Sequence, residues 1–510
     1  MVASKISPLF RTLIARRDLT IAVIVLLFAL QAAIRSNSYL NPDIAWYIYA
    51  GGRLLDGARY YVDVVDLMPP FVIWASMPIA AIGRVTGVNV EIIFHTVLLT
   101  LTAVSICLSA RLIAAATDIT AGARHLFLVL LAALVLFLPA SDFGQRDHVV
   151  IVLASPWVFL RWSRLIDRPV PWGLAAVIGL MAAVGLWLNS YFLFVVIALE
   201  IAVLLVARNA RIALRIETLG IVGLGLTYML ALWFASFKSS VKISLVGMRV
   251  LDPTDQVGLE DFELRLALVA VLLAITIATS RLLSAKSRLL QTVLVVVGTA
   301  FMFVFLVQPG FRYQLIPAHF FLTLAAGLGL ARLGAGEVTI FGPLERTAAA
   351  AAALAILVVF AGTLSVQTFP YQGRSLERAI IAEAPKARSF FIASVDISHS
   401  FPLVEETGLI WASRYSSQWL APYVANNLDE DGGPADDIGR TVIKSTYDDL
   451  KAFAPEIVFV NENPVRPRFT GPPLDHVKLW ETDERLKFFW RNKYRRRGVV
   501  DGFGVYVLKE

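Results

Sequence analysis

The sequence predicts an α-helical polytopic membrane protein with about eleven transmembrane helices and a C-terminal α/β domain outside the membrane. Of its 510 residues, 57% are hydrophobic and only 17% are charged, whereas a soluble chain carries about a quarter charged residues. The apolar residues come in blocks near 20 residues, the length of a helix that crosses a hydrocarbon layer about 30 Å thick. After residue 367 these blocks stop, and charges, turn residues and short strand-like runs take their place.

The charge pattern favours a membrane setting over nucleic-acid binding. The formal net charge is +7, but the basic residues are scattered in short clusters between apolar blocks. Such clusters set topology and contact anionic lipid headgroups, so we expect membrane lipids and no nucleic acid as partners. Cys107 is the single cysteine, which excludes a disulfide within the chain and a thiolate metal cage.

The N-terminus is predicted to lie in the cytoplasm. Lys5, Arg11, Arg16 and Arg17 precede the first apolar block, and the positive-inside rule places such residues on the cytoplasmic side. The basic region is long and many further apolar blocks follow. We therefore expect a retained first helix rather than a cleaved signal peptide.

The later spans follow from alternation across the membrane. The expected spans are 19–36, 91–111, 123–140, 149–165, 172–188, 191–207, 218–236, 263–280, 289–307, 315–333 and 346–366. With these bounds, the basic clusters at 161–168, 208–215 and 281–288 all face the cytoplasm. The pattern requires that the proline-containing stretch 70–82 does not cross, and that 172–207 forms two helices hinged near Asn189 and Ser190.

The domain prediction follows from the same count. Residues 1–366 form the transmembrane region, with a large first outer loop at 37–90, and residues 367–510 form a periplasmic α/β domain of an inner-membrane protein. Strand-like runs at 389–395, 456–460 and 504–508 and a helix start at 447–453 support the α/β assignment. The loops 37–90, 141–148, 237–262 and 308–314 all face the periplasm.

The first outer loop combines acids, arginines and aromatic rings. Asn41 can cap a helix with Pro42 in its first turn, which places Asp43 and Tyr47 on one face. Arg59 and Tyr60 follow in the same loop, and arginine offers a bidentate fork to phosphate. These residue types suit a phosphate-and-sugar site at a membrane surface. The alternative is that Asp43 only complements the helix dipole and that the loop is solvated beside an aromatic belt.

The second outer loop, 141–148, is short and strongly charged. Asp142, Arg146, Asp147 and His148 lie between two apolar spans, more ionisable groups than a turn requires. Asp142, Asp147 and His148 are also candidate ligands of a divalent cation, although short carboxylate and histidine clusters are often only hydrogen-bonded networks.

A third polar segment, 308–319, carries Arg312 and Tyr313 at the expected outer mouth of a span and His319 inside it. The alternatives are a snorkelling arginine and an interhelical hydrogen bond from the histidine.

In their order and shared side of the membrane, these segments resemble the GT-C superfamily of membrane glycosyltransferases. That superfamily includes protein mannosyltransferases, the aminoarabinose transferases that modify lipid A, and oligosaccharyltransferase catalytic subunits. The resemblance covers residues 1–335. It lies in Asp43-x-x-x-Tyr47, the closing segments 57–61 and 69–70 of the first loop, the charged loop 141–148, and the Arg-Tyr…Pro segment at 312–317. Many members carry paired acids in the first loop, whereas Pro42 and Ile44 flank Asp43 here, which weakens a metal assignment.

The resemblance implies an inverting glycosyltransferase that takes a sugar from a polyprenyl-phosphate donor and passes it to a lipid, glycan or protein acceptor. By position, Asp43 matches the acid that acts as base toward the acceptor hydroxyl, and Asp142 or Asp147 matches the assisting acid. The expected catalytic residues are therefore Asp43 and Asp147. The expected residues for the donor phosphate and substrate are Tyr47, Arg59, Tyr60, Arg146, His148, Arg312 and Tyr313. A secondary transporter, a polysaccharide ligase or polymerase, and a scaffold that displays the C-terminal domain are the competing interpretations.

Overall fold

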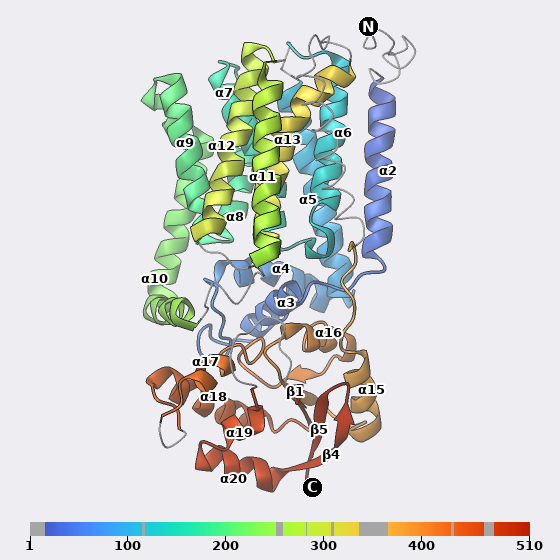
Figure 1. Cartoon of the computed structure of the whole chain (residues 1–510), viewed down its shortest axis with the longest axis vertical. Coiled ribbons are helices and arrows are strands. Elements are labelled where there is room, and N and C mark those ends of the chain that lie inside the picture. Colours follow the sequence, from blue (N-terminus) through green and yellow to red (C-terminus); the bar gives the residue numbers. More distant parts are fainter. Residues whose placement is uncertain are drawn as a thin grey trace. The chain divides into compact units, whose positions relative to one another are not determined.

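Helices make up most of the chain in the computed structural model, which describes residues 16–114, 118–250, 259–281, 283–307, 311–335, 366–429, 433–463 and 474–509 (Figure 1). The chain divides into two compact units. The first comprises Met1–Ser38, Glu91–Ala231 and Val257–Phe369, and the second comprises Tyr39–Val90, Leu232–Gln256 and Pro370–Glu510. The loop predicted at 37–90 thus groups with the C-terminal residues.

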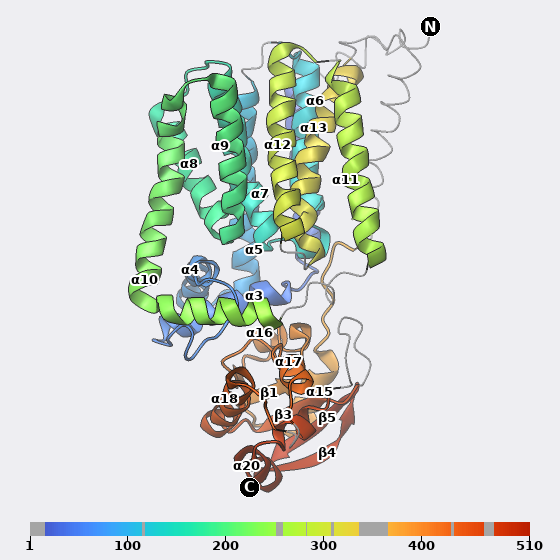
Figure 2. The same cartoon turned by 60° about the vertical axis from the view of Figure 1, so that its left-hand side comes forward.

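The first unit is a bundle of helices with short 3-10 turns between them (Figures 1 and 2). Its helices are α2 (Arg17–Arg35), α5 (Val90–Ile113), α6 (Ala121–Phe137), α7 (Arg146–Leu165), α8 (Trp172–Trp187), α9 (Leu193–Ala207), α10 (Ile216–Val250, which continues into the second unit), α11 (Leu259–Ser280), α12 (Ala285–Val307) and α13 (Ile316–Gly334). The 3-10 turns are η2 (Ala140–Asp142), η3 (Ser190–Phe192), η4 (Ala210–Leu214) and η6 (Arg312–Leu315).

These helices match the apolar blocks of the sequence, and by length and composition the chain is a multi-pass membrane protein. Within the described residues, six helices are long and apolar enough to cross a membrane, and four shorter apolar helices accompany them. The count of eleven spans stays a prediction, because residues 346–365 of the last expected span lie outside the described residues. The expected outer loop 237–262 is wrong in its first part, since α10 continues through Val250.

The predicted break near Asn189 is confirmed. Helix α8 ends at Trp187, and the Asn189 side chain then accepts a hydrogen bond from the backbone N–H of Tyr191, which caps the short turn η3. Helix α9 begins directly after this turn, at Leu193. The apolar block 172–207 therefore folds as two helices because an asparagine supplies the local hydrogen bond that interrupts it.

Close packing holds the bundle together. Helix α12 packs against α9 and α13, and α7 packs against α8 and approaches α12 and α13 (Figure 2). Gly179 lets α8 approach the start of α10, because a Cβ there would lie 2.6 Å from the Glu217 Cα. Small residues at such crossings are typical of helices that associate in a membrane.

The second unit contains a five-stranded sheet with helices around it. Its strands are β1 (Ser389–Ala393), β2 (Ile410–Trp411), β3 (Ile457–Asn461), β4 (Tyr494–Val500) and β5 (Phe503–Leu508). The order is β2-β1-β3-β5-β4, with the first three strands parallel and β4 and β5 forming an antiparallel hairpin on β3. The helices are α3 (Pro42–Leu55), α4 (Phe71–Thr86), α15 (Arg374–Glu383), α16 (Leu403–Thr407), α17 (Ala421–Asn426), α18 (Asp437–Phe453), α19 (His476–Trp480) and α20 (Glu484–Lys493), with the 3-10 turn η7 (Ile397–His399).

The first outer loop is built into this second unit. The Trp411 backbone N–H donates to the Tyr49 hydroxyl over 3.2 Å, and the backbone N–H of Val65 donates to the Arg414 carbonyl over 2.7 Å. The Trp46 ring meets Phe401 edge to face at 5.5 Å. Helix α3, which carries Asp43, is therefore held by Trp411 of strand β2 and by Phe401, which precedes that strand.

Candidate functional site

A tight turn between α6 and α7 presents the charged residues of the second outer loop. Gly144 adopts a φ of +92°, a backbone conformation that other residues rarely adopt, and it leads into α7 two residues later. Arg146, Asp147 and His148 consequently form the first turn of α7 rather than a loop. The positive end of the helix dipole favours a carboxylate at this place.

His148 holds this turn in shape. Its Nδ1 accepts the backbone N–H of Gly144 at 2.8 Å, so its Nε2 carries the proton and donates to the Val135 carbonyl at 2.9 Å. The ring is fully buried and is therefore a neutral imidazole with both nitrogens in use. This arrangement favours a structural role for His148 over donor binding.

The divalent-cation site considered for Asp142, Asp147 and His148 has little support in this geometry. Among the described residues, no group of three His, Cys, Asp or Glu side chains is placed to hold a metal ion. A metal on either ring nitrogen of His148 would also displace one of its two backbone partners.

Asp147 is an almost fully buried carboxylate of the first unit. Asp147 is 2% exposed, and its Oδ2 atom has no hydrogen-bond partner among the residues that the structure describes. A buried polar oxygen without a partner is costly, so such a group is a strong candidate for contact with a ligand.

Arg146 joins two polar segments that are far apart in the sequence. Its Nη2 donates to the Tyr313 hydroxyl at 3.2 Å, and both residues are buried. The structure thus brings the second and third polar segments of the sequence together at one place in the bundle. We call Arg146, Asp147 and Tyr313 the Asp147 cluster.

The other two candidates of the third polar segment are His319 and Arg312. His319 is buried within α13. The side chain of Arg312 lies outside the described part of the chain, so its role in donor binding stays a prediction.

The first-loop candidates belong to the second unit and differ widely in exposure. Asp43 is half-buried in the first turn of α3, where the Asn41 side chain accepts its backbone N–H, and Tyr47 is buried. The Tyr60 hydroxyl donates to the Met68 carbonyl at 2.6 Å and so helps to close the loop. The approach of Asp43 to the Asp147 cluster stays a prediction.

Arg59 is the most exposed of these candidates. Its side chain is 72% exposed and pairs with Asp63 at 3.3 Å. The hydrogen bond from the Arg59 backbone N–H to this carboxylate holds the pKa of Asp63 below its usual value. In the described conformation, Arg59 is therefore occupied by its own loop.

Sequence reasoning missed one buried cation beside this turn. Arg35, in the last turn of α2, is 4% exposed, and its guanidinium carbon lies 4.9 Å from the centroid of the Phe143 ring. A signal was available in the sequence, because the expected cytoplasmic N-terminus predicts residue 35 on the outer side, where the positive-inside rule does not favour arginine.

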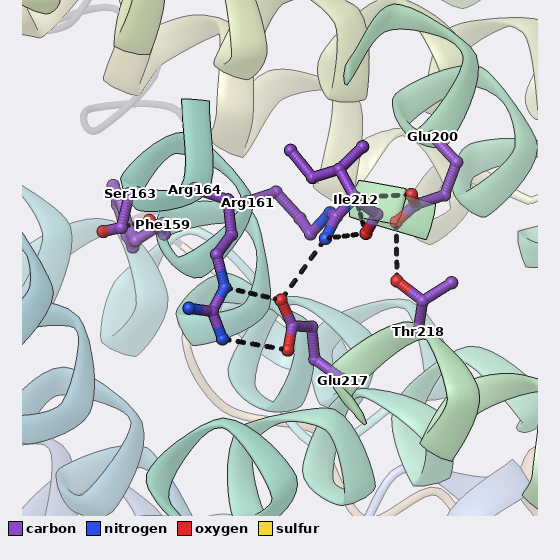
Figure 3. Close-up of polar contacts among 8 residues, drawn as sticks. All are labelled: Phe159, Arg161, Ser163, Arg164, Glu200, Ile212, Glu217 and Thr218. Atoms are coloured by element: carbon purple, nitrogen blue, oxygen red, sulfur yellow. Dashed lines mark hydrogen bonds and ion pairs between the residues drawn. The ribbon is translucent and has the colours of Figure 1, made fainter. Parts of the chain in front are cut away.

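A second buried group of charges lies at the other end of α7 (Figure 3). We call Arg161, Arg164, Glu200, Glu217 and Thr218 the Arg161 cluster. The Arg161 guanidinium forms ion pairs with the carboxylates of Glu200 at 2.6 Å and Glu217 at 3.3 Å. The Arg164 guanidinium donates hydrogen bonds to both carboxylate oxygens of Glu217. The hydroxyl of Thr218 donates to the remaining oxygen of Glu200 at 3.2 Å. Two arginines expected to face lipid headgroups thus instead neutralise two glutamates.

Comparison with solved structures finds similarity to a mycobacterial enzyme. It is similar to the cryo-EM structure of the arabinofuranosyltransferase AftD from mycobacteria, with a TM-score of 0.49 and 15% identity over 96% of this chain and 40% of that chain. A mutant of the same enzyme gives a TM-score of 0.48 and 14% identity over 97% of this chain and 42% of that chain. No protein-family model matches the sequence, and no curated protein does. The chain spans well under half the length of the AftD structures it matches.

Proposed function

We propose that this protein is an inverting membrane glycosyltransferase that uses a polyprenyl-phosphate sugar as donor. Its acceptor is a lipid, polysaccharide or protein at the periplasmic face of the inner membrane. The observation that carries the proposal is the Asp147 cluster: a buried carboxylate with an unpartnered oxygen among the described residues, next to an arginine that contacts a tyrosine hydroxyl. The order and expected sidedness of the polar segments in the sequence support the same function.

The proposed reaction needs one carboxylate and at least one cation. The carboxylate takes the proton from the acceptor hydroxyl as the hydroxyl oxygen bonds to the anomeric carbon of the sugar. The bond from that carbon to the phosphate oxygen breaks, and the lipid phosphate leaves with the electron pair. Because the attack is in line, the anomeric configuration is inverted.

Two carboxylates are candidates for the base. Asp43 matches by its place in the first outer loop, and Asp147 has the stronger physical support, since its burial and its unpartnered oxygen favour contact with a ligand. We assign Asp43 to the acceptor hydroxyl and Asp147 to the assisting position. Substitution of each carboxylate tests whether the reaction needs it.

Arg146 is the proposed partner of the departing phosphate. Its guanidinium already contacts the Tyr313 hydroxyl, which fixes the direction in which the side chain points. A preorganised cation in a water-poor site stabilises charge that develops in the transition state. Arg312 is a second candidate by sequence position, whereas Arg59 would first have to leave Asp63.

The test uses the full chain in proteoliposomes with a panel of radiolabelled polyprenyl-phosphate sugars and membrane extract as acceptor. We expect transfer by the wild type, a loss of roughly a hundredfold or more in Asp147→Asn and in Asp43→Asn, and no change in the exposed control Asp167→Asn. If no donor in the panel is consumed, the glycosyltransferase proposal fails. Wild-type transfer by Asp147→Asn would remove Asp147 from the mechanism.

A secondary transporter is the second candidate, and one observation bears on it. Transporters use ionisable groups within their membrane helices, and the Arg161 cluster is such a group. Each of its carboxylate oxygens, however, already accepts a hydrogen bond, which leaves little capacity for a transported ion or proton. Uptake of a solute by the same proteoliposomes without sugar transfer would favour the transporter.

A further inference from the structure

Arg35 makes contacts with two segments of the first unit that are distant in the sequence. Its Nη2 donates to the carbonyl of Ala140 over 3.4 Å and also to the carbonyl of Gln367. Its guanidinium lies over the ring of Phe143. One side chain at the end of α2 thus contacts both the turn before α7 and the segment that follows residue 365.

Neighbouring contacts reinforce this junction. The Gln367 side chain donates to the Phe137 carbonyl at 3.0 Å, and the backbone N–H of Phe369 donates to the Ser38 hydroxyl at 3.0 Å. The residues that form these two hydrogen bonds are close in the sequence to Arg35 and to its partners. The end of α2, the end of α6 and residues 367–369 are therefore tied to one another.

Phe143 links Arg35 to the residues of the Asp147 cluster. Its ring is fully buried and lies 4.5 Å from the ring of His148 on one contact and 4.9 Å from the guanidinium of Arg35 on another. The turn that precedes Asp147 is thus held from two directions, by the hydrogen bonds of His148 and by Arg35. A shift in either support would move the first turn of α7.

From these contacts we infer that Arg35 is a positioning residue, which fixes the turn at 138–145 and through it the Asp147 carboxylate and the Arg146 guanidinium. This inference rests on the proposed function for its effect on catalysis. In this role Arg35 acts through backbone carbonyls and an aromatic ring rather than through a contact with the donor. Lysine cannot replace it, because an ammonium lacks the planar guanidinium, whose Nη2 donates to two carbonyls while its face lies over the ring of Phe143.

The alternative role for a buried arginine here is direct binding of the donor phosphate, and the two roles differ in kinetics. Loss of positioning misplaces the reacting groups, so in Arg35→Lys we expect kcat to fall roughly ten- to a hundredfold with KM for the donor little changed. Loss of a phosphate contact would raise KM, and lysine would retain much of that contact. The matched control is Arg17→Lys, an exposed arginine of the same helix, which we expect to leave kcat and KM unchanged.

A second measurement is independent of catalysis. Hydrogen–deuterium exchange of the amides in 138–148 should be faster in Arg35→Lys and in Phe143→Leu than in the wild type or Arg17→Lys. Unchanged exchange in both variants, or a raised KM with an unchanged kcat, overturns the inference. If the wild type transfers no sugar, the proposed function fails, and the exchange rates alone then decide whether Arg35 holds the turn.

Discussion

Helix α7 carries buried charges at both of its ends, and the carboxylates at the two ends differ in their hydrogen bonding. In the Arg161 cluster, all four oxygens of Glu200 and Glu217 accept hydrogen bonds, and two arginines balance two glutamates (Figure 3). In the Asp147 cluster, one carboxylate oxygen has no partner in the described part of the chain. Arg146 and Arg161 are fifteen residues apart, so about 22 Å of helix separates two similar sets of side chains.

The difference separates a structural role from a functional one. A buried ion pair compensates the cost of leaving water only when its remaining hydrogen-bonding capacity is filled, as it is for both glutamates of the Arg161 cluster. A buried carboxylate oxygen without a hydrogen-bond partner destabilises the folded protein. Such an oxygen is retained at sites where a bound ligand supplies the missing hydrogen bond. We therefore expect substitutions in the Arg161 cluster to change stability and substitutions in the Asp147 cluster to change activity.

The largest expected effect on stability is that of Arg161→Met. The substitution leaves Glu200 and Glu217 buried with one charge too few to balance them, and removal of one partner from a buried ion pair costs about 3–5 kcal/mol. Thermal denaturation of the purified protein in detergent measures the loss. Transfer per folded molecule should stay at the wild-type level.

The control for this substitution is Arg215→Met, which removes an exposed arginine near the start of α10 and should change the unfolding free energy by less than about 0.5 kcal/mol. If Arg161→Met were as stable as the control but inactive, the Arg161 cluster would be functional and the contrast between the two ends would fail.

The sequence was sufficient for much of the helical bundle. Apolar blocks of membrane length give α2, α5 and α12 to within a few residues, and Asn189 marks the break between α8 and α9. These features depend on local composition and local hydrogen bonds. The extension of α10 to Val250 was missed because its second half, from 237 on, mixes lysines and serines with apolar residues and was interpreted as a loop.

In the second unit, regular patterns were predictable and irregular ones were not. Strands β1, β3 and β5 are short apolar runs, and all three were expected. Strand β4 was missed because it begins Tyr-Arg-Arg-Arg, a sequence typical of solvated coil that folds here as the exposed edge of the sheet. The helix expected from 447 in fact begins ten residues earlier, at Asp437, where the side chain of Asp436 caps it.

For the candidate site, the sequence identified candidate residues but could not predict the hydrogen bonds between them. Arg146, Asp147 and Tyr313 were selected by residue type and sidedness, and the contact between Arg146 and Tyr313 joins two of the three segments. The His148 side chain bonds to the backbone because of the turn at Gly144. This turn could not be predicted from the periodicity of the sequence. Arg35 was missed although its place at the expected outer end of the first span was a signal, and its partners, Ala140 and Gln367, are more than a hundred residues away.

A smaller effect, now on activity, is expected for Arg146→Lys. Lysine keeps the charge but loses the planar fork that points the cation, so the transition state should lose about 2–4 kcal/mol, which is roughly thirty- to a thousandfold in kcat/KM. The matched substitution at the other end is Arg161→Lys, which should lower the melting temperature and leave transfer per folded molecule unchanged. Equal effects of both substitutions on kcat/KM would contradict the contrast.

The smallest expected effect comes from removing one hydroxyl group from each of the two clusters, that of Tyr313 or that of Thr218. Tyr313→Phe deletes the acceptor of the 3.2 Å hydrogen bond from Arg146, and such a bond contributes about 1–2 kcal/mol, so kcat/KM should fall roughly five- to thirtyfold with little change in melting temperature. Thr218→Val deletes the 3.2 Å hydrogen bond to Glu200 at nearly constant volume, and it should lower stability by about 1 kcal/mol while activity is retained. Because the two deletions remove hydrogen bonds of the same length, a difference in what they impair reflects the role of each cluster. A loss of activity in Thr218→Val with none in Tyr313→Phe would reverse the assignment of the two ends.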